Sequence, residues 1–428
     1  MRSLISLAAV LIALGGCHAK TGAPGEAPTG VTAKAGDGLV VLNWDVVPDL
    51  TYWIFLAAGD TVSVGQPGSF AIRRAIAPRV VNGLTNDTKY AFAMNATHND
   101  SSAGPLSLPV PATPRLAGTQ WPPGTLVATQ NLRNIGFNGS LLVVVGDAAT
   151  VFAQDFNYVQ GATTLVPPAT FPSGYTSDLV AATFSTGWLV LARDGTTISS
   201  PDGVNWYQNL SIGQFGPIPA GGMNGITFGF VGNVVPTYVA VGAAGTVYVS
   251  HDLLSWAAAT SVGTTNDLYN VALVNGFFIA VGAGGTVIIS QDGNNWQAPL
   301  NGTGTTAALR SIAFGPSASS PTLVAYVAVG DGGTIIASPD TNTWTAATWN
   351  TAVTPVAQDL RSVTVGGAAG TRFLAVGQGG AVAYSDDGFA PNSWNVPSSG
   401  TTSNLAKVLY IGGVYFGVGD GGAELESR

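Results

Sequence analysis

The 428-residue chain carries little charge, because Asp, Glu, Lys and Arg together make up only 9% of its residues. Basic residues number 15 against 23 acidic ones, which gives a net charge of −8 at pH 7. The four lysines are scattered through the sequence, and no cluster of basic residues occurs. Nucleic acids and anionic lipid surfaces are bound mainly through clustered Lys and Arg. The sequence therefore argues against nucleic acid as a partner and against binding to a charged membrane surface.

Histidine and cysteine are also scarce. The three histidines, His18, His98 and His251, are far apart in the sequence and cannot be placed together with a nucleophile. A Ser-His-Asp triad or a His-ligated metal site is therefore not expected, and we predict neither a cofactor nor a metal. Cys17 is the only cysteine, so no disulfide can form within the chain and stability must come from packing.

Glycine is abundant instead, with 57 residues, and it recurs in a repeated pattern. The pattern is an apolar run, Val-Gly-x-Gly-Gly-Thr, a second apolar run, Ser-x-Asp and then Trp. One copy runs from Val281 to Trp296, and the next runs from Val329 to Trp344. A repeat of about 40 to 50 residues made of short strands and tight turns indicates the blades of a β-propeller.

Seven copies of the glycine turn are present, and we predict seven blades over residues 117–428. The turns lie at Val145–Gly146, Leu191–Ala192, Val241–Gly242, Val281–Gly282, Val329–Gly330, Val376–Gly377 and Val418–Gly419. The seventh copy has no Asp and no Trp after it, whereas Trp121 stands ahead of the first copy. We therefore expect Trp121 to belong to the outer strand of the last blade, so that both ends of the propeller share one sheet and leave no open edge.

The Ser-x-Asp-x-x-x-Trp element resembles the Asp-box (BNR) repeat of sialidases, some glucan hydrolases and the propellers of photosystem II assembly factors. The resemblance covers residues 117–428 and implies that the Asp accepts backbone N–H groups in a turn while the Trp packs between sheets. It gives a structural role to Asp202, Asp252, Asp292, Asp340 and Asp387. The first copy departs from the pattern at Ala153–Gln154–Asp155 and Tyr158, and the sixth inserts residues before Trp394.

The N-terminus has the features of an export signal. Arg2 precedes an apolar run from Leu4 to Leu14, which is too short to span a bilayer. Leu14–Gly15–Gly16–Cys17 resembles a bacterial lipobox, which implies a signal peptide over residues 1–16, a lipidated Cys17 and a flexible tether over residues 17–27. With His18 rather than Asp after the cysteine, the resemblance implies anchoring to the outer membrane, on either its periplasmic or its surface face. The alternative is an ordinary signal peptide that happens to end near a cysteine.

Residues 28–114 resemble a fibronectin type III domain. Leu39–Trp44 alternates as a strand does, Trp44 matches the core tryptophan of that family, and Leu84 with Tyr90 matches its tyrosine-corner pattern. The expected fold is therefore all-β throughout, a fibronectin type III β-sandwich followed by a seven-bladed propeller.

One constellation of residues is a candidate binding site. Aligning the innermost strands of the seven copies places one residue from each copy at an equivalent position near the channel mouth: Arg133, Val180, Asn224, Tyr269, Arg310, Arg361 and Ala406. Arg193 reaches the same face from a glycine turn. We expect Arg133, Arg193, Tyr269, Arg310 and Arg361 to bind a ligand, with Phe171, Tyr175, Tyr207 and Phe215 brought to that face by long connections. In the alternative, pairs such as Asp359 with Arg361 only neutralise each other at the channel rim.

These features favour a non-catalytic binding or assembly protein of the cell envelope, docking a protein or glycan partner. A sialidase-like glycan hydrolase is the first alternative, since three arginines from three copies resemble a carboxylate clamp. Such enzymes have six blades and a Tyr–Glu nucleophile pair, however, and the propeller's only glutamates are Glu424 and Glu426. A structural subunit of a surface layer or appendage is the second alternative.

Overall fold

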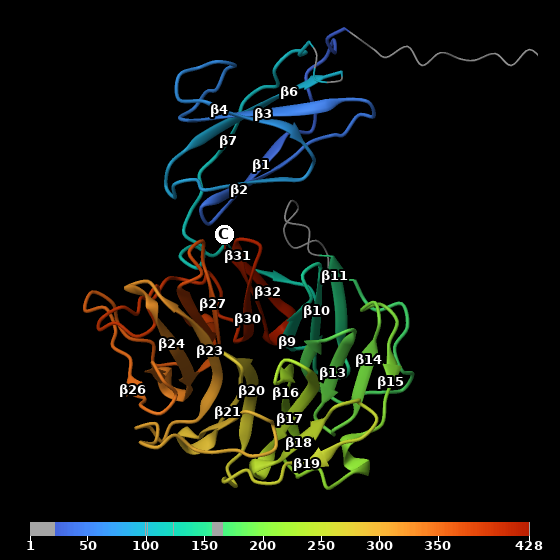
Figure 1. The fold of residues 1–428 in the computed structure, drawn as a ribbon, viewed down its shortest axis with the longest axis vertical. Helices are drawn as coiled ribbons and strands as arrows, with labels where there is room; N and C mark the ends of the chain where they lie inside the picture. Colours follow the sequence, from blue (N-terminus) through green and yellow to red (C-terminus); the bar gives the residue numbers. More distant parts are fainter. Residues whose placement is uncertain (1–21, 99, 101, 123, 156–165, 428) are drawn as a thin grey trace, which may run out of the picture. The chain divides into compact units, whose positions relative to one another are not determined.

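The computed structural model describes residues 22–98, 100, 102–122, 124–155 and 166–427. The predicted signal peptide, Cys17, His18 and Tyr158 lie outside these residues. The described part is built of short antiparallel strands and three-residue 3₁₀ turns, which confirms the prediction of an all-β fold (Figure 1). No helix in this part has the length and apolar character needed to cross a membrane. The described residues divide into two compact units, one formed by those within 22–33, 42–79 and 88–112 and the other by those within 34–41, 80–87 and 113–427.

The N-terminal region contains two sheets. One has the order β1 (Thr32–Gly36), β2 (Leu39–Asn43) and β5 (Arg79–Asn82), and the other has the order β4 (Phe70–Ala75), β3 (Thr51–Ala58), β6 (Tyr90–Thr97) and β7 (Val110–Ala112). Trp44 is buried, with its ring centroid 5.5 Å from that of Tyr52. The Tyr52 hydroxyl accepts a hydrogen bond from Val47 N (2.8 Å) and donates one to Asp45 O (3.3 Å). The sequence analysis matched Tyr90 to the tyrosine-corner pattern and did not single out Tyr52.

The rest of the described chain forms seven antiparallel sheets. The first three are β9 (Leu132–Phe137), β10 (Leu141–Gly146) and β11 (Val151–Asp155); β12 (Leu179–Phe184), β13 (Trp188–Ala192), β14 (Thr197–Ser200) and β15 (Tyr207–Gln208); and β16 (Met223–Val231), β17 (Val235–Gly242), β18 (Val247–Ser250) and β19 (Ala257–Ala258).

The next three sheets are β20 (Leu268–Val274), β21 (Phe277–Gly282) and β22 (Val287–Ser290); β23 (Leu309–Ser317), β24 (Ser320–Gly330), β25 (Ile335–Ser338) and β26 (Thr345–Ala346); and β27 (Leu360–Gly366), β28 (Arg372–Gly377) and β29 (Val382–Ser385). The last contains β30 (Leu405–Ile411), β31 (Val414–Gly419), β32 (Ala423–Ser427) and β8 (Thr125–Leu126). The 3₁₀ turns are η1 (Ile212–Gln214), η2 (Ala243–Gly245), η3 (Ala283–Gly285), η4 (Asp331–Gly333), η5 (Gln378–Gly380) and η6 (Asp420–Gly422).

The first strand of each sheet contacts the first strand of the next, and the series returns to its start. The sequence of contacts is β9, β12, β16, β20, β23, β27, β30 and again β9 (Figure 1). Apolar clusters lie between successive sheets. Trp394, for example, is fully buried between β24–β25 of one sheet and β27–β28 of the next. Burial of such apolar faces against one another is the main driving force for packing the sheets together.

The ring closes through a hydrogen-bonded motif of Ser, Gly and Trp that is split between the two ends of the ring. Within one repeat, Gly293 N donates to Ser290 Oγ and Trp296 Nε1 donates to Gly293 O. At the closure Gly118 N donates to Ser427 Oγ (2.8 Å), and Trp121 Nε1 donates to Gly118 O (3.2 Å). Trp121 is buried in the last sheet's core as expected. The strand that pairs with β32, however, is β8 at residues 125–126, four residues beyond the predicted position.

Candidate functional site

The first strand of every sheet in the ring has a β-bulge at its second residue. In β23, Leu309 pairs with Gly330 and Ser311 pairs with Val329, so Arg310 between them has no partner in β24. The same interruption leaves out one residue in each of the other first strands: Arg133, Val180, Asn224, Tyr269, Arg361 and Ala406. A bulge redirects the extra residue's side chain. These seven residues are the ones that the repeat alignment made equivalent, so the structure gives that alignment a physical cause.

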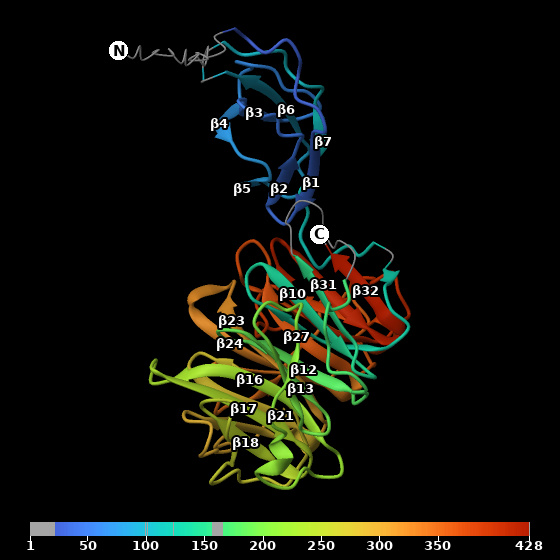
Figure 2. The same cartoon turned by 90° about the vertical axis from the view of Figure 1, so that its right-hand side faces the viewer.

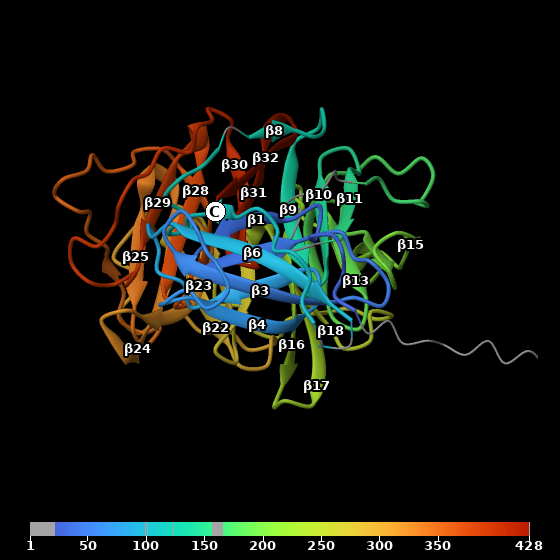
Figure 3. The same cartoon turned by 90° about the horizontal axis from the view of Figure 1, so that it is seen from above.

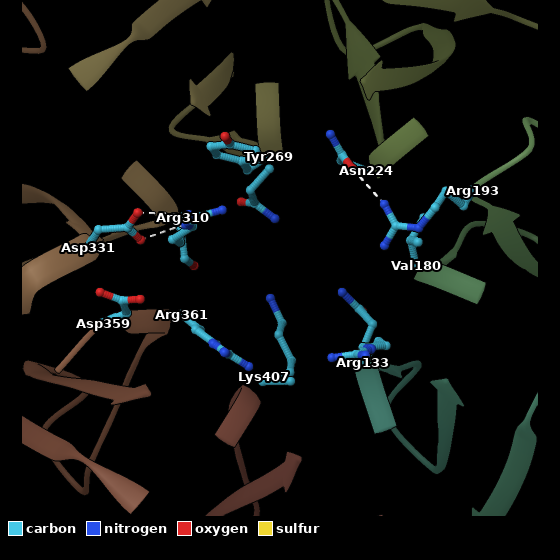
Figure 4. A pocket seen from close by; sticks show the side chains of 14 residues that line it. Arg133, Val180, Arg193, Asn224, Tyr269, Arg310, Asp331, Asp359, Arg361 and Lys407 are labelled. Carbon is cyan, nitrogen blue, oxygen red and sulfur yellow. Dashed lines mark hydrogen bonds and ion pairs between the residues drawn. The ribbon is translucent and has the colours of Figure 1, made fainter. Parts of the chain in front are cut away.

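The seven bulged residues line one cavity of about 360 Å³ at the centre of the ring (Figure 4). Their neighbours complete its wall: Asn134, Arg193, Asn270, Ser311, Asp331, Asp359 and Lys407. Five of the fourteen lining side chains are cations and two are carboxylates. The structure thus brings together Arg133, Arg193, Tyr269, Arg310 and Arg361, which come from five different sheets.

Two of the arginines are held firmly by carboxylates from the glycine turns. Arg310 donates to both oxygens of Asp331 at 2.7 and 2.8 Å, and its guanidinium carbon lies 4.2 Å from the ring centroid of Tyr269. Arg133 makes the same two-point contact with Asp147 at 2.7 and 2.6 Å. The bond to its carboxylate raises the pKa of each arginine. These contacts fix the two guanidinium groups in place.

The other three cations are less fully paired. Arg361 lies 3.9 Å from Asp420, and Arg193 lies 3.9 Å from Asp178 while donating a hydrogen bond to Asn224 Oδ1 at 3.2 Å. Lys407 Nζ forms no ion pair or hydrogen bond with any residue that the structure describes, and burial lowers the pKa of this amine. Figure 4 shows Lys407 between Arg361 and Arg133, pointing into the cavity. Sequence reasoning missed Lys407, which directly follows the aligned residue Ala406.

Asp359 does not pair with Arg361 in the structure, contrary to the pairing that the sequence suggested. Its carboxylate accepts a hydrogen bond from Gly332 N (2.9 Å) in the turn of the preceding sheet. Equivalent side chains tie four other junctions between sheets in the same way, with the pairs Asn131 and Gly421, Asp178 and Ala148, Asp267 and Ala244, and Asn404 and Gly379. These acceptors therefore hold neighbouring sheets in register, and Asp178 also lies 3.9 Å from Arg193.

The aromatic residues expected at the channel face lie elsewhere. Phe171 packs against Tyr175 and Trp206, each at 6.5 Å between ring centroids, and belongs to the apolar cluster of the second sheet. Tyr207 lies in the outer strand β15, and neither it nor Phe215 lines the cavity. None of the four expected side chains lines the cavity, although Tyr175 does reach a glycine turn, where its hydroxyl donates to Asp194 at 3.0 Å. Tyr269 is the aromatic side chain that does line the cavity.

The Asp-box aspartates occupy turns away from the cavity. Asp292 Oδ1 accepts backbone N–H groups from Asn294 and Asn295, both at 2.8 Å. Burial alone would raise the pKa of Asp292, but these hydrogen bonds lower it to about 2. Asp202, Asp252 and Asp340 make the same pair of bonds. Asp387 differs, since its carboxylate accepts from Ala390 N, Ser317 Oγ and Ser319 N.

Comparison with solved structures identifies the ring as a β-propeller. A structure described as YCF48 bound to D1 peptide superposes with a TM-score of 0.54 at 17% identity, covering 73% of this chain and 99% of that one. YCF48 from Cyanidioschyzon merolae gives 0.51 at 17% identity, covering 72% and 98%. The WD40 β-propeller domain of Doa1 gives 0.53 at 10% identity, covering 72% and 97%. No family model matches the sequence, and no curated protein matches it. At these identities the likeness establishes the fold.

Proposed function

We propose that this chain is a non-catalytic binding and assembly protein whose seven-bladed propeller docks an acidic segment of a partner protein at the central cavity. The observation that carries this proposal is the set of weakly paired cations, Arg193, Arg361 and Lys407, in the cavity wall. Gathering five cations around one cavity with only part of their charge paired is unfavourable because like charges repel, even though the Arg193 and Arg361 side chains are 45% and 30% exposed. A ligand that supplies carboxylates would recover that cost, and binding is the reason such an arrangement would persist.

The two firmly held arginines would orient a bound carboxylate. Arg133 and Arg310 are fixed by Asp147 and Asp331, so their remaining N–H groups point in constant directions. Pre-oriented donors lose little side-chain entropy on binding and favour one orientation of a carboxylate. A propeller neighbour that is described as bound to a peptide, YCF48, supports a protein rather than a glycan as the partner.

The remaining parts of the chain fit an envelope location in this proposal. Cys17 would carry the lipid anchor, residues 17–27 would act as a tether, and residues 28–114 would form a fibronectin type III spacer. The two sheets of the N-terminal region and its buried Trp44 support the spacer assignment. The anchor would hold the protein at the outer membrane, on the periplasmic or the surface side.

The sialidase-like alternative finds less support in the cavity. A glycosidase needs two carboxyl groups facing the scissile bond. Of the two carboxylates in the wall, Asp331 is bonded to Arg310, and Asp359 is bonded to the Gly332 amide. We therefore propose binding without catalysis, and a structural subunit is the weaker alternative because it gives the weakly paired cations no role.

The test removes two of the three weakly paired cations, Arg361 and Lys407, and leaves the firm pairs of Arg133 and Arg310 intact. We expect Arg361→Gln with Lys407→Gln to weaken binding of a fluorescein-labelled Asp- and Glu-rich peptide at least tenfold, or about 1.4 kcal/mol, measured by fluorescence anisotropy. The same peptide with Asn and Gln in place of its acids should bind poorly to both proteins. Because the interaction is ionic, the affinity of the wild type should fall as salt rises.

Two control proteins separate binding from folding and from overall charge. Arg79→Gln with Lys89→Gln makes the same change in net charge in the N-terminal region, and it should bind as the wild type does. Asp292→Ala should lower the melting temperature without a specific loss of binding. If the Arg361 and Lys407 variant stays folded and binds the acidic peptide normally, the proposed site is wrong.

A further inference from the structure

One hairpin of the propeller has a tip that the other sheets lack. The β16–β17 hairpin projects beyond the neighbouring strands (Figures 2 and 3). At its end Phe230 is 51% exposed, Val234 is 74% exposed and Val235 is 41% exposed. Phe230 rests edge-on against Phe228 at 5.2 Å between ring centroids. Exposed apolar side chains are common singly, whereas a cluster on a projecting turn indicates a contact surface.

The repeats of the ring supply an internal comparison. The corresponding turns of other sheets are short and rich in polar residues or glycine: Asn138–Ser140, Ser185–Gly187, Asn275–Gly276, Gly367–Thr371 and Gly412–Gly413. The other long hairpin, β23–β24, has a serine-rich turn, where Ser317 and Ser319 bond to Asp387. Folding of a sheet in this ring therefore does not need an apolar tip, and the exposed part of the β16–β17 tip is available for a contact outside the sheet.

The hairpin itself carries no charged residue, and the acidic residue of its own sheet nearest the projecting part is Asp252, in the turn after Ser250, which pairs with Tyr238. No Asp, Glu, Lys or Arg occurs between Asp202 and Asp252 in the sequence. The tip is also convex, because the chain reverses at Gly232 and Asn233, which both have positive φ. A protein partner normally requires a shaped, partly polar interface. A lipid bilayer requires only apolar side chains without charge, and it accepts a protruding turn.

The position of the tip fits a bilayer as its occupant. Asn224, near the start of β16, lines the central cavity, and the tip lies beyond Val231 at the far end of the same strand. At about 3.3 Å per residue these two points are about 20–25 Å apart along the strand. A tip in the membrane would therefore leave the cavity facing away from the bilayer and open to a partner.

We infer that the β16–β17 hairpin inserts Phe230, Val234 and Val235 into the lipid surface of the membrane that carries the anchored protein. The choice of a bilayer rests on the proposed lipid anchor, since a single weak apolar contact matters when the protein is already held at the membrane. The acyl chain supplies most of the affinity, and the tip adds a weaker affinity of its own and fixes the orientation. Net charge −8 disfavours an anionic surface, so the contact is apolar rather than electrostatic.

The experiment uses residues 18–428, which omits the apolar run from Leu4 to Leu14 and Cys17, because either would bind lipid by itself. We expect this protein to float with phosphatidylcholine vesicles in a density gradient. Phe230→Ser with Val234→Ser and Val235→Ser should reduce the vesicle-bound fraction at least tenfold. Leu300→Ser, at a residue 86% exposed on another connection, is the matched control and should leave flotation unchanged.

A second readout locates the contact. Residues 18–428 contain no cysteine, so Val234→Cys can be labelled uniquely with an environment-sensitive fluorophore. Its emission should shift to shorter wavelength on adding vesicles and be quenched by lipids carrying quenchers in their acyl chains. The same label at Leu300→Cys should not respond. Acidic-peptide binding to the cavity is measured separately, so failure of one proposal leaves the other standing.

Three results would overturn the inference. The wild-type protein could fail to float with the vesicles at any lipid concentration tested. The triple serine variant could float as well as the wild type. Finally, the wild type could form a dimer that the triple variant does not form, which would assign the tip to a second copy of the chain.

Discussion

Glu424 and Glu426 lie two residues apart on β32, so their side chains share one face of the closing sheet. Glu424 is buried, and its Oε2 atom has no hydrogen-bond partner among the described residues. Burial, with a contribution from the nearby Glu426, raises the pKa of Glu424 to about 7. The folded protein therefore holds a proton that the unfolded chain, with a glutamate pKa near 4.5, releases.

This difference makes stability depend on pH in a defined direction. The group contributes fully below pH 4.5, and the contribution is lost as pH rises towards 7, because the folded state must then bury a charge. A shift from 4.5 to about 7 corresponds to about 3 kcal/mol. We expect Glu424→Gln to melt like the wild type at pH 4.5 and at a clearly higher temperature at pH 8. Exposed Glu26→Gln is the control, and equal melting of wild type and Glu424→Gln at pH 8 would contradict the argument.

Single residues of the cavity could be predicted from the sequence only where the repeat carried them. Arg310 and Arg361 could be aligned because the bulge recurs at the same place in each first strand. Lys407 could not, since neighbouring residues in a regular strand face opposite sides. The bulge at Ala406 interrupts that alternation and brings Lys407 to the cavity as well. The bulge depends on pairing with the second strand, which sequence patterns do not reveal.

At the scale of one structural element, the glycine turn has two glycines with different roles. Gly332 and Gly333 in η4 both have positive φ, at 62° and 69°. A Cβ atom on Gly332 would meet open space, whereas one on Gly333 would overlap the carbonyl oxygen of Val356 in the connection to the next sheet. Ala244 takes the first position in η2 at φ 53°, which shows that alanine is tolerated there. The second glycine is needed for close approach as well as for its backbone conformation.

The two positions make a matched pair of substitutions. Gly332→Ala should cost about 1 kcal/mol, since only the left-handed backbone conformation is penalised. Gly333→Ala carries the same penalty and also forces the two sheets apart, so we expect a further loss of about 1–3 kcal/mol. Chemical denaturation of both variants measures the difference. Equal destabilisation of the two variants would show that the connection at Val356 moves aside easily. In the first turn the second position is already alanine, Ala149, with φ 58°.

At the scale of the whole molecule, the sequence repeat predicted how the ends of the ring meet but not which backbone atoms pair. Trp121 was recognisable because five of the other six copies have a tryptophan after their turn. Its indole packs as expected, and Ser427 supplies the hydroxyl that Ser290 supplies in an interior copy. The pairing strand could not be placed because β8 contains only Thr125 and Leu126, too few residues for a recognisable pattern. Such short outer strands are specified by what they pack against.

Closure of the ring links residues 309 positions apart, whereas the same Ser, Gly and Trp motif within one repeat links residues three apart. Loss of an interior motif should therefore loosen one turn, while loss of the closing motif should release both ends of the propeller, because a long loop is no longer held shut. We expect Ser290→Ala with Trp296→Ala to raise hydrogen exchange mainly around its own sheet. Ser427→Ala with Trp121→Ala should raise exchange in β8, in β32 and in β9 of the adjoining first sheet.

Both double variants remove a buried tryptophan, so each should lose about 3–5 kcal/mol of stability. Because the chemistry removed is the same, only the extent of the exchange distinguishes them, and that extent reports what closure does for the ring. If the closing variant loses protection from hydrogen exchange only around residues 118–126, the contacts between β30 and β9 close the ring without the split motif. Exchange that spreads through both end sheets would instead place the cooperativity of the propeller in the joint between its two ends.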